Sequence, residues 1–551
     1  MDIQRARPTS ASTPGPTADR ARPPQPAGQQ PSTRQPVSGP PLIGLLIIGL
    51  LNAFGPPSIA AADLADLPSP THTIATDSIA SDSQAPADAN RPSPTARQPD
   101  LDALLAEIDA LRRRHDIAAT AVVLVDNERT LAVRTFGVRN RTERTPADPE
   151  TRFKIGSISK AITGLALLRA EDLGLLGLDR PLTERLPDLD IPLFDNPWQA
   201  ETPLTLAMLM EHTAGWHDMS RDEFDHPAKQ PIPLTEALAV RPASRRSHWR
   251  PGVFSEYSNS GPGLAGFLLE RAAGESFETF VERELFAPLG MTGSSFLPDP
   301  TTLENLAQGY DRDARSPIPY WHILYRPSGG LNVRPADMAP LLRLLLRRGE
   351  LDGRRLFAPE RIDRLETPST TAAASAGTRI GYALGIQASQ HRGHTLHSHG
   401  GDGDGYLARI AYSRTAGRGY FVVITAFDHR PLNAMRQRLS DWLIADLPPP
   451  PAPPEARLQP ESLTRWTGTY QLASTRFPQP GWQDRRLTVS LRNGRLHTQP
   501  DGQTARPLIA IDPRRFRRPH ETEASTTFSL LPDGSIALQG PLGNWLKPAP
   551  P

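Results

Sequence analysis

The chain contains no cysteine and only four lysines, at positions 154, 160, 229 and 547. Without cysteine there are no disulfides, no cysteine-ligated zinc, no iron–sulfur cluster and no thiol nucleophile. Neither sign of charge prevails, because the chain has 61 basic and 60 acidic residues. This balance gives no support to general nucleic-acid binding, so we expect no nucleic-acid partner.

Large apolar side chains are almost missing from residues 1–40. Residues 1–40 are too polar to build a core, and the apolar run over 42–51 is shorter than the roughly 20 residues of a membrane span. With the arginines before it and the small residues at 60–62, that run is typical of an export signal. We predict a polar extension and signal peptide over 1–62, and an exported protein, periplasmic or extracellular. An uncleaved membrane anchor and a start site placed too far upstream are the alternatives.

Proline is abundant and divides the chain. Sixty prolines are about twice the usual share, and they gather at the ends and at one joint. Residues 63–98 are predicted to be a disordered linker, and 447–460 a stiff proline-rich linker. The folded domains are therefore predicted at 99–446 and 461–551.

Local patterns indicate different structures on the two sides of the second linker. Apolar residues at helical spacing predict a helix over 100–115, and 120–138 predicts two strands around a polar turn. Helical and strand patterns then alternate up to the linker. Beyond it, Asn493-Gly494 and Asp533-Gly534 lie between short alternating runs, which predicts β-hairpins and an all-β domain.

A serine and one of the rare lysines form the first candidate site. Ser157 comes just before a helical apolar pattern and Lys160 follows three residues later, so both side chains should lie on one face. A serine hydroxyl needs a base to become a nucleophile, and a lysine of depressed pKa can be that base. The backbone N–H groups at the helix start suit an oxyanion. The alternative is a helix cap with an exposed lysine, which is the commoner meaning of this pair taken alone.

Two further polar segments contain candidate residues. Tyr257-Ser258-Asn259 precedes a helical pattern, where a tyrosine could shuttle a proton; the alternative is a core tyrosine beside a helix cap. His399 precedes a glycine-rich turn over 400–405, and glycine lets backbone approach a ligand closely. The alternatives there are a tight surface loop or a calcium turn, although the segment is too short for an EF-hand.

These three motifs occur in one order: Ser157-Ile158-Ser159-Lys160, Tyr257-Ser258-Asn259 and His399-Gly400-Gly401. Together they resemble the serine β-lactamase and penicillin-binding protein superfamily. The resemblance is to its class C β-lactamase-like branch, which includes D-alanyl-D-alanine carboxypeptidases, D-amino-acid peptidases and esterases. Flanking segments of the same kind lie at 204–216, 284–296 and 328–346.

The resemblance covers about 100–445 and implies an α+β fold, an antiparallel sheet flanked by helices with an additional helical subdomain. The start of the last domain, at 463–472, resembles the small lipocalin-like β-barrel that some members carry after a linker. That domain is also the candidate surface for oligomer formation. A membrane contact is expected only through an N-terminal anchor.

The resemblance further implies an acyl-enzyme mechanism without any cofactor or metal. Ser157 would be the nucleophile, Lys160 its base or proton relay, and Tyr257 a partner in the same proton transfer. Which of Lys160 and Tyr257 is the true base stays open.

Four positions are expected to bind the substrate: Asn259, His399, Gly401 and Asp402. The oxyanion hole would combine the backbone N–H of Ser157 with that of Asp402.

One departure from the resemblance limits the substrate. His399 stands where penicillin-recognising enzymes usually carry lysine, and a neutral histidine holds a substrate carboxylate weakly. We also expect the carboxylates of Asp402 and Asp404 beside the cleft, where they would repel anions. The sequence thus predicts an exported serine hydrolase for a small-molecule or peptide substrate, acting on peptide bonds, D-amino-acid ones included, or on ester bonds. The alternatives are a β-lactamase or cell-wall DD-carboxypeptidase, and a catalytically silent binding or sensor protein with the same fold.

Overall fold

The computed structural model describes residues 100–184, 192–224, 226 and 230–549. The signal peptide and the linker predicted over 1–98 lie outside these ranges and stay predictions. None of the helices within the described ranges is both long and apolar enough to cross a lipid bilayer. Below, the described residues before the linker 447–460 are called the larger domain, and those after it the C-terminal domain.

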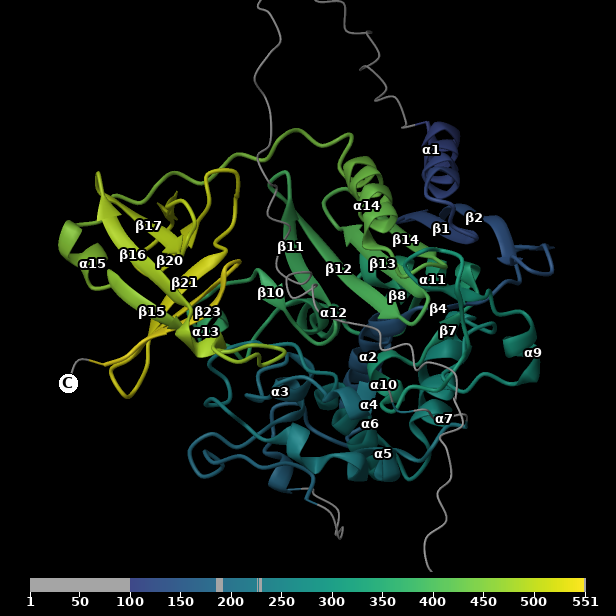
Figure 1. The fold of residues 1–551 in the computed structure, drawn as a ribbon, viewed down its shortest axis with the longest axis horizontal. Helices are drawn as coiled ribbons and strands as arrows, with labels where there is room; N and C mark the ends of the chain where they lie inside the picture. Colours follow the sequence, from purple (N-terminus) through teal and green to yellow (C-terminus); the bar gives the residue numbers. More distant parts are fainter. Residues whose placement is uncertain (1–99, 185–191, 225, 227–229, 550–551) are drawn as a thin grey trace, which may run out of the picture. The chain divides into compact units, whose positions relative to one another are not determined.

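The larger domain is built on an eight-stranded antiparallel sheet with the strand order β10-β11-β12-β13-β14-β1-β2-β3 (Figure 1). Its strands are β1 (Ala119–Asp126), β2 (Thr130–Asn140), β3 (Thr145–Pro146), β10 (Gly381–Tyr382), β11 (Gln387–His391), β12 (His394–Gly403), β13 (Tyr406–Ser413) and β14 (Arg418–Ile424). The two strands predicted over 120–138 are confirmed. β1 pairs with β14, with Thr120 opposite Ile424, so the beginning and end of this domain meet inside the sheet.

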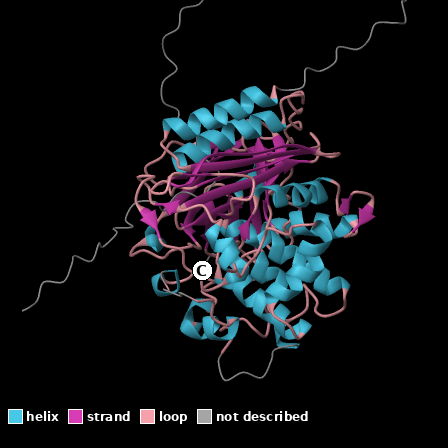
Figure 2. Cartoon of the chain, turned by 90° about the vertical axis from the view of Figure 1, so that its right-hand side faces the viewer, coloured by secondary structure: helices cyan, strands magenta, loops and turns pink. Residues whose placement is uncertain are grey.

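Helices α1 (Leu101–Arg114) and α14 (His429–Leu443) pack together on one face of this sheet (Figure 2). The predicted N-terminal helix is thereby confirmed. Its apolar positions Leu105, Ile108 and Leu111 are buried against the strands. The helix is amphipathic because these residues recur every three residues along it.

The opposite face of the sheet is covered by the helical part of the domain (Figure 2). Its helices are α2 (Ser159–Asp172), α3 (Leu206–Met210), α4 (Arg221–Phe224), α5 (Leu234–Val240), α6 (Ser260–Ala273), α7 (Phe277–Val281), α8 (Ala287–Leu289), α9 (Pro300–Glu304), α10 (Arg326–Gly329), α11 (Met338–Leu346), α12 (Pro359–Glu366) and α13 (Ala372–Ser375). α2 is buried over most of its length. A helix that is buried all round belongs to the core, and this one begins at the candidate serine.

Three pairs of short strands complete the larger domain. They are β4 (Phe153–Lys154) with β7 (Asn332–Val333), β5 (Gly309–Tyr310) with β6 (Pro317–Ile318), and β8 (Glu350–Leu351) with β9 (Arg354–Arg355). The first pair leads directly to Ser157, because β4 ends three residues before it.

The C-terminal domain contains a nine-stranded antiparallel sheet in the order β18-β17-β16-β15-β23-β22-β21-β20-β19 (Figure 1). Its strands are β15 (Gly468–Leu472), β16 (Arg486–Arg492), β17 (Arg495–Pro500), β18 (Arg506–Pro507), β19 (Ile509–Ala510), β20 (Arg515–Arg517), β21 (Thr526–Leu530), β22 (Ile536–Gly540) and β23 (Gly543–Lys547). The sheet is nearly closed into a barrel, since the Leu508 N–H near one end donates to the Leu496 carbonyl of β17 near the other, at 2.8 Å.

Both predicted hairpins are present. Asn493 and Gly494 connect β16 to β17 and have φ values of +50° and +76°, the left-handed pair that a two-residue turn requires. Asp533 and Gly534 lie in the connection from β21 to β22. The expectation of an all-β domain needs one correction, because the helix α15 (Pro460–Thr464) precedes the first strand.

The C-terminal domain contacts the larger domain through apolar and polar groups. Trp249 and Phe254 belong to a buried cluster that includes Ala537 of β22. Nearby, the side-chain amide of Asn544 donates to the Ser255 carbonyl at 2.8 Å. These contacts lie next to the motif Tyr257-Ser258-Asn259, so the two domains meet beside the candidate site.

Candidate active site

Ser157 lies in a tight turn against which the end of β12 packs. The turn is the 3₁₀ segment Gly156–Ile158, which leads into α2. At Gly156, whose φ is +52°, a Cβ atom would lie 2.5 Å from the Asp402 carbonyl oxygen and 2.8 Å from its nitrogen. At Gly401 a Cβ would lie 1.8 Å from the Ile155 carbonyl oxygen. Only glycine fits both positions, and this close packing places the Asp402 backbone against Gly156, next to Ser157. The oxyanion hole itself stays a prediction.

Lys160 is fully buried and its Nζ has three oxygen neighbours. They are Ser157 Oγ at 3.0 Å, Asn259 Oδ1 at 2.7 Å and the Ser328 carbonyl at 2.5 Å. Burial lowers the pKa of Lys160 well below its ordinary value; the negative charge of Asp218 opposes this shift and the positive charge of Arg476 reinforces it. The shift favours the neutral amine over the ammonium ion.

The partners of that amine determine where its lone pair points. A carbonyl oxygen can only accept, so the two N–H groups of a neutral amine are used on Asn259 Oδ1 and the Ser328 carbonyl. Ser157 Oγ lies 3.0 Å from Nζ, and in the neutral amine the lone pair would face it. This arrangement suits removal of the hydroxyl proton.

The Asn259 amide is itself oriented by a buried carboxylate. Its Nδ2 donates to both oxygens of Asp218, at 3.0 and 3.2 Å, and its backbone N–H donates to Oδ1 at 2.7 Å. Because a carboxylate only accepts, the NH2 group must face Asp218. Oδ1 of Asn259 is then turned toward Lys160.

Tyr257 completes the group around the serine hydroxyl. Its side chain is hydrogen-bonded to Ser157, and its ring lies 4.9 Å from Lys160 Nζ. Burial raises the pKa of Tyr257, an effect that the positive charge of Arg476 opposes. The phenol thus keeps its proton and is a hydrogen-bond donor.

His399 lies near the tyrosine, in a chain of hydrogen bonds. Its Nδ1 lies 2.5 Å from the Gly400 carbonyl and its Nε2 lies 2.5 Å from Tyr382 Oη. The carbonyl must accept, so Nδ1 carries the proton and Nε2 accepts from the tyrosine. Burial lowers the pKa of His399 to about 3. The residue is therefore neutral in the physiological range and offers no cation to a substrate carboxylate.

The glycine-rich segment after His399 differs from the turn we expected. β12 continues through Gly403, and only Asp404 and Gly405 lie between it and β13. Side chains alternate along a strand, so Asp402 lies on the face opposite His399. There its carboxylate approaches His429 of α14, at 3.6 Å. The Asp402 carboxylate therefore points away from His399, although its charge still acts on Lys160 and Tyr257. Its role in substrate binding stays a prediction, and its backbone lies beside the Ser157 turn.

The sequence pattern of the beta-lactamase family matches residues 101–441. The chain belongs to this family. One curated relative is a beta-lactamase of Pseudomonas fluorescens, 29% identical over 210 residues, which are 37% of this chain and 53% of that protein. The chain spans about half the length of the curated relatives it matches first.

Two solved structures show the same fold at low sequence identity. The octameric penicillin-binding protein homologue of Pyrococcus abyssi is 20% identical with a TM-score of 0.53, over 81% of this chain and all of that one. A beta-lactamase/D-alanine carboxypeptidase of Yersinia pestis is 20% identical with a TM-score of 0.51, over 62% of this chain and 99% of that one. At these identities the likeness concerns the fold alone. Membership of the beta-lactamase family indicates a serine hydrolase.

Sequence reasoning missed three residues around this beta-lactamase-family site. Tyr382 holds His399, and Asp218 holds Asn259. Arg476 comes from the C-terminal domain and forms an ion pair with Asp218, with Nη2 and Oδ2 2.6 Å apart. No local pattern marks these residues, because each acts through a partner distant in sequence. Ser328 could have been found, since it opens the flanking segment 328–346.

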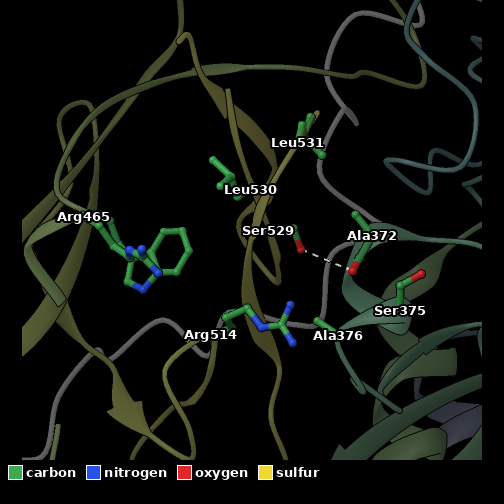
Figure 3. A pocket seen from close by; sticks show the side chains of 9 residues that line it. Ala372, Ser375, Ala376, Arg465, Arg514, Ser529, Leu530 and Leu531 are labelled. Carbon is green, nitrogen blue, oxygen red and sulfur yellow. Dashed lines mark hydrogen bonds between the residues drawn. The ribbon is translucent and has the colours of Figure 1, made fainter. Parts of the chain in front are cut away.

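A separate hollow of about 580 Å³ lies between α13 and the C-terminal domain (Figure 3). It is lined by residues such as Arg465, Arg514 and Leu530, and by none of the predicted site residues. The hollow is therefore separate from the candidate site at Ser157. No group of three or more metal-ligating side chains occurs within the described part of the chain.

Proposed function

We propose that this protein is a serine hydrolase in which Ser157 forms an acyl-enzyme with a peptide or ester substrate. The observation that carries the proposal is the buried Lys160 amine, whose Nζ lies 3.0 Å from Ser157 Oγ. Export belongs to the same proposal and rests on the sequence of residues 1–62 alone.

In the acylation step, Ser157 Oγ attacks the carbonyl carbon of the substrate while its proton passes to Lys160 Nζ. The electron pair of the carbonyl double bond moves to oxygen, where the backbone N–H groups of Ser157 and Asp402 would stabilise the negative charge. The bond to the leaving group then breaks. Tyr257 donates a proton to the departing amine or alcohol and is reprotonated from Lys160.

In the second step, water attacks the ester carbon of the acyl-enzyme. Its proton passes to Lys160, and Ser157 Oγ leaves with a proton as the hydroxyl. The product is a carboxylic acid, and the enzyme returns to its starting state. Lys160 is favoured over Tyr257 as the base, because burial lowers the pKa of the amine and raises that of the phenol.

The substrate class follows from the charge of the site. His399 is neutral and its Nε2 is occupied by Tyr382, so it offers little to the carboxylate of a β-lactam. Neutral acyl groups in peptide bonds, those of D-amino acids included, or in ester bonds therefore fit better. A β-lactamase or D-alanine carboxypeptidase activity is the second candidate, supported by family membership and by the printed activity of the Yersinia pestis structure.

Intact-mass spectrometry after treatment with a fluorophosphonate tests the proposal. We expect one adduct on the wild type and none on Ser157→Ala, with Ser159→Ala as the matched control that keeps its adduct. A folded wild type without an adduct would contradict the proposal and favour a silent binding protein. A panel of D-amino-acid amides, short-chain esters and a chromogenic cephalosporin then separates the two candidates, because rapid cephalosporin turnover would favour the second.

A further inference from the structure

A short segment of the C-terminal domain reaches the catalytic site. Just after β15, the Arg476 carbonyl accepts a hydrogen bond from the Asp218 backbone N–H at 2.9 Å. One residue earlier, the Thr475 carbonyl lies 2.7 Å from His217 Nδ1. The Ser474 hydroxyl donates to the Glu256 carboxylate at 2.7 Å. These contacts fix the backbone of segment 474–476 against the loop that carries Asp218.

The side chain of Arg476 contacts both Asp218 and Tyr257, the two residues next to the Ser157–Lys160 pair. Its Nε donates to Asp218 Oδ2 at 2.7 Å, and Nη2 lies 2.6 Å from the same oxygen. Its guanidinium carbon is 4.6 Å from the centre of the Tyr257 ring, a cation–π distance. The Asp218 side chain is fully buried, so this arginine supplies the positive charge that such a carboxylate needs.

A continuous chain of hydrogen bonds leads from this arginine to the nucleophile. Arg476 holds Asp218, Asp218 fixes the direction of the Asn259 amide, and Asn259 Oδ1 takes one N–H of Lys160. Lys160 Nζ donates to Asn259 Oδ1 and to the Ser328 carbonyl, and these two contacts orient the amine toward Ser157. The residues come from both domains, so the larger domain alone lacks the first member of the chain.

We infer that Arg476 is a positioning residue of the active site, through which the C-terminal domain holds Asp218, Asn259 and Lys160 in their working arrangement. The inference rests on the proposed acyl-enzyme function and extends it, because it makes the C-terminal domain part of the catalytic apparatus. Arg476 acts here through Asp218 and takes no part in the bond changes.

The charge of Arg476 also matters to the protonation of Lys160. The charged and titratable groups that lie close to Lys160 or act on it through their charge are Asp218, Arg476, Asp402, Tyr257, His212 and His399. Asp218 raises the pKa of Lys160 and Arg476 lowers it. Without Arg476 the buried carboxylate is left uncompensated, so the lysine would be protonated at a higher pH and would lose its lone pair.

The test is the pH dependence of the rate at which a neutral fluorophosphonate labels Ser157, measured on the full chain. Acylation needs the neutral amine, so labelling falls as the pH drops through the pKa of Lys160. In Arg476→Met we expect the pH at which the labelling rate falls to half, here called the acidic limb, to move up by about one pH unit or more. Asp218→Asn should move it down, and the double variant Asp218→Asn/Arg476→Met should return it toward the wild type.

Two controls separate positioning from general damage. Arg495→Met removes an arginine of the same domain that pairs with Glu455 at the surface, and we expect the wild-type profile. Arg476→Lys keeps the charge but not the paired N–H contacts, so its limb should stay near the wild type while its maximal rate falls. If Arg476→Met does not fold, Asp218→Asn is compared with the double variant.

The outcomes distinguish this inference from the proposed function. A folded Arg476→Met with the wild-type profile overturns the inference, as do identical profiles in Asp218→Asn and the double variant. A wild type that is not labelled at any pH overturns the proposed function and the inference with it.

Discussion

Asn259 Oδ1 accepts a hydrogen bond from Lys160 Nζ at 2.7 Å, although the two residues are 99 positions apart. The contact joins the start of α2 to the start of α6, two helices that pack against each other in the core. It requires the Asn259 amide to face one way only, and Asp218 fixes that direction. The first role of the Asn259 amide is therefore to orient Lys160, and contact with a substrate would come second.

We predict that Asn259→Asp will slow acylation by about 100-fold or more, the range associated with general-base catalysis. The shape of the side chain is kept, but a carboxylate there would face Asp218 and hold Lys160 as an ammonium ion. The measurement is the labelling rate of Ser157 by a fluorophosphonate at neutral pH. Asn493→Asp, in the β16–β17 turn, is the matched control. A rate within a few-fold of the wild type would show that Asn259 does not control the lysine.

The sequence allowed much of this site to be predicted, but only where the chemistry is local. Ser157 and Lys160 are one helical turn apart, so their contact follows from spacing alone. Asn259 was expected to touch substrate, and its contacts with Lys160 and Asp218 could not be read from the motif. Arg476 lies 258 residues from Asp218, and nothing in the local pattern connects them.

The fold shows the same division between local and long-range information. The N-terminal helix and both hairpins follow from periodicity and turn residues, which act within a few positions. The glycine-rich segment after His399 was expected to be a turn, yet β12 continues through Gly403. Its pairing with β13 and its packing against Ile155 and Gly156 overcome the weak strand preference of glycine. Such tertiary contacts cannot be predicted from the sequence of this segment alone.

We predict that the contribution of Glu256 to the free energy of unfolding falls as pH rises from about 5 to 8. Burial raises the pKa of Glu256 to about 7, while its hydrogen bond from Ser474 and the charge of Arg476 oppose the shift. A carboxyl whose pKa is raised in the folded state favours folding while it is protonated, and that gain is lost as pH rises through the folded pKa. The contribution is at most about 3 kcal/mol.

Thermal unfolding of Glu256→Gln against pH measures this contribution. Glutamine stays neutral, so the free energy of unfolding of the wild type minus that of the variant should fall between pH 5 and 8. Burial also raises the pKa of Glu366 to about 7. Glu366→Gln is the comparison variant, because Glu366 accepts from Tyr412 and Arg414 of the larger domain, whereas Glu256 accepts from Ser474 of the C-terminal domain. Parallel curves for wild type and Glu256→Gln would contradict the prediction.

We predict that His399→Lys will raise the ratio of cephalosporin turnover to short-chain ester turnover by about 10-fold, which corresponds to about 1.4 kcal/mol. The substitution places a cation where the wild type has a neutral ring, so it favours substrates that carry a carboxylate. Steady-state kcat/KM for the two substrates measures the ratio. Tyr382→Phe removes the same hydrogen bond without adding charge, so its ratio should match the wild type. An unchanged ratio in His399→Lys would mean that residue 399 does not set this preference.

The last prediction concerns the close packing of β12 against the Ser157 turn. A Cβ at Gly401 would lie 1.8 Å from the Ile155 carbonyl oxygen, so Gly401→Ala must push the strand and the turn apart. That movement separates the backbone N–H groups of Ser157 and Asp402, and loss of one oxyanion donor lowers turnover by about 100- to 1,000-fold. Gly403→Ala is the matched control on the same strand and the same face, because its Cβ would meet only the Lys154 side chain, at 3.7 Å. We expect Gly403→Ala to keep most of its ester turnover, and similar losses in the two variants would contradict an oxyanion hole between β12 and the turn.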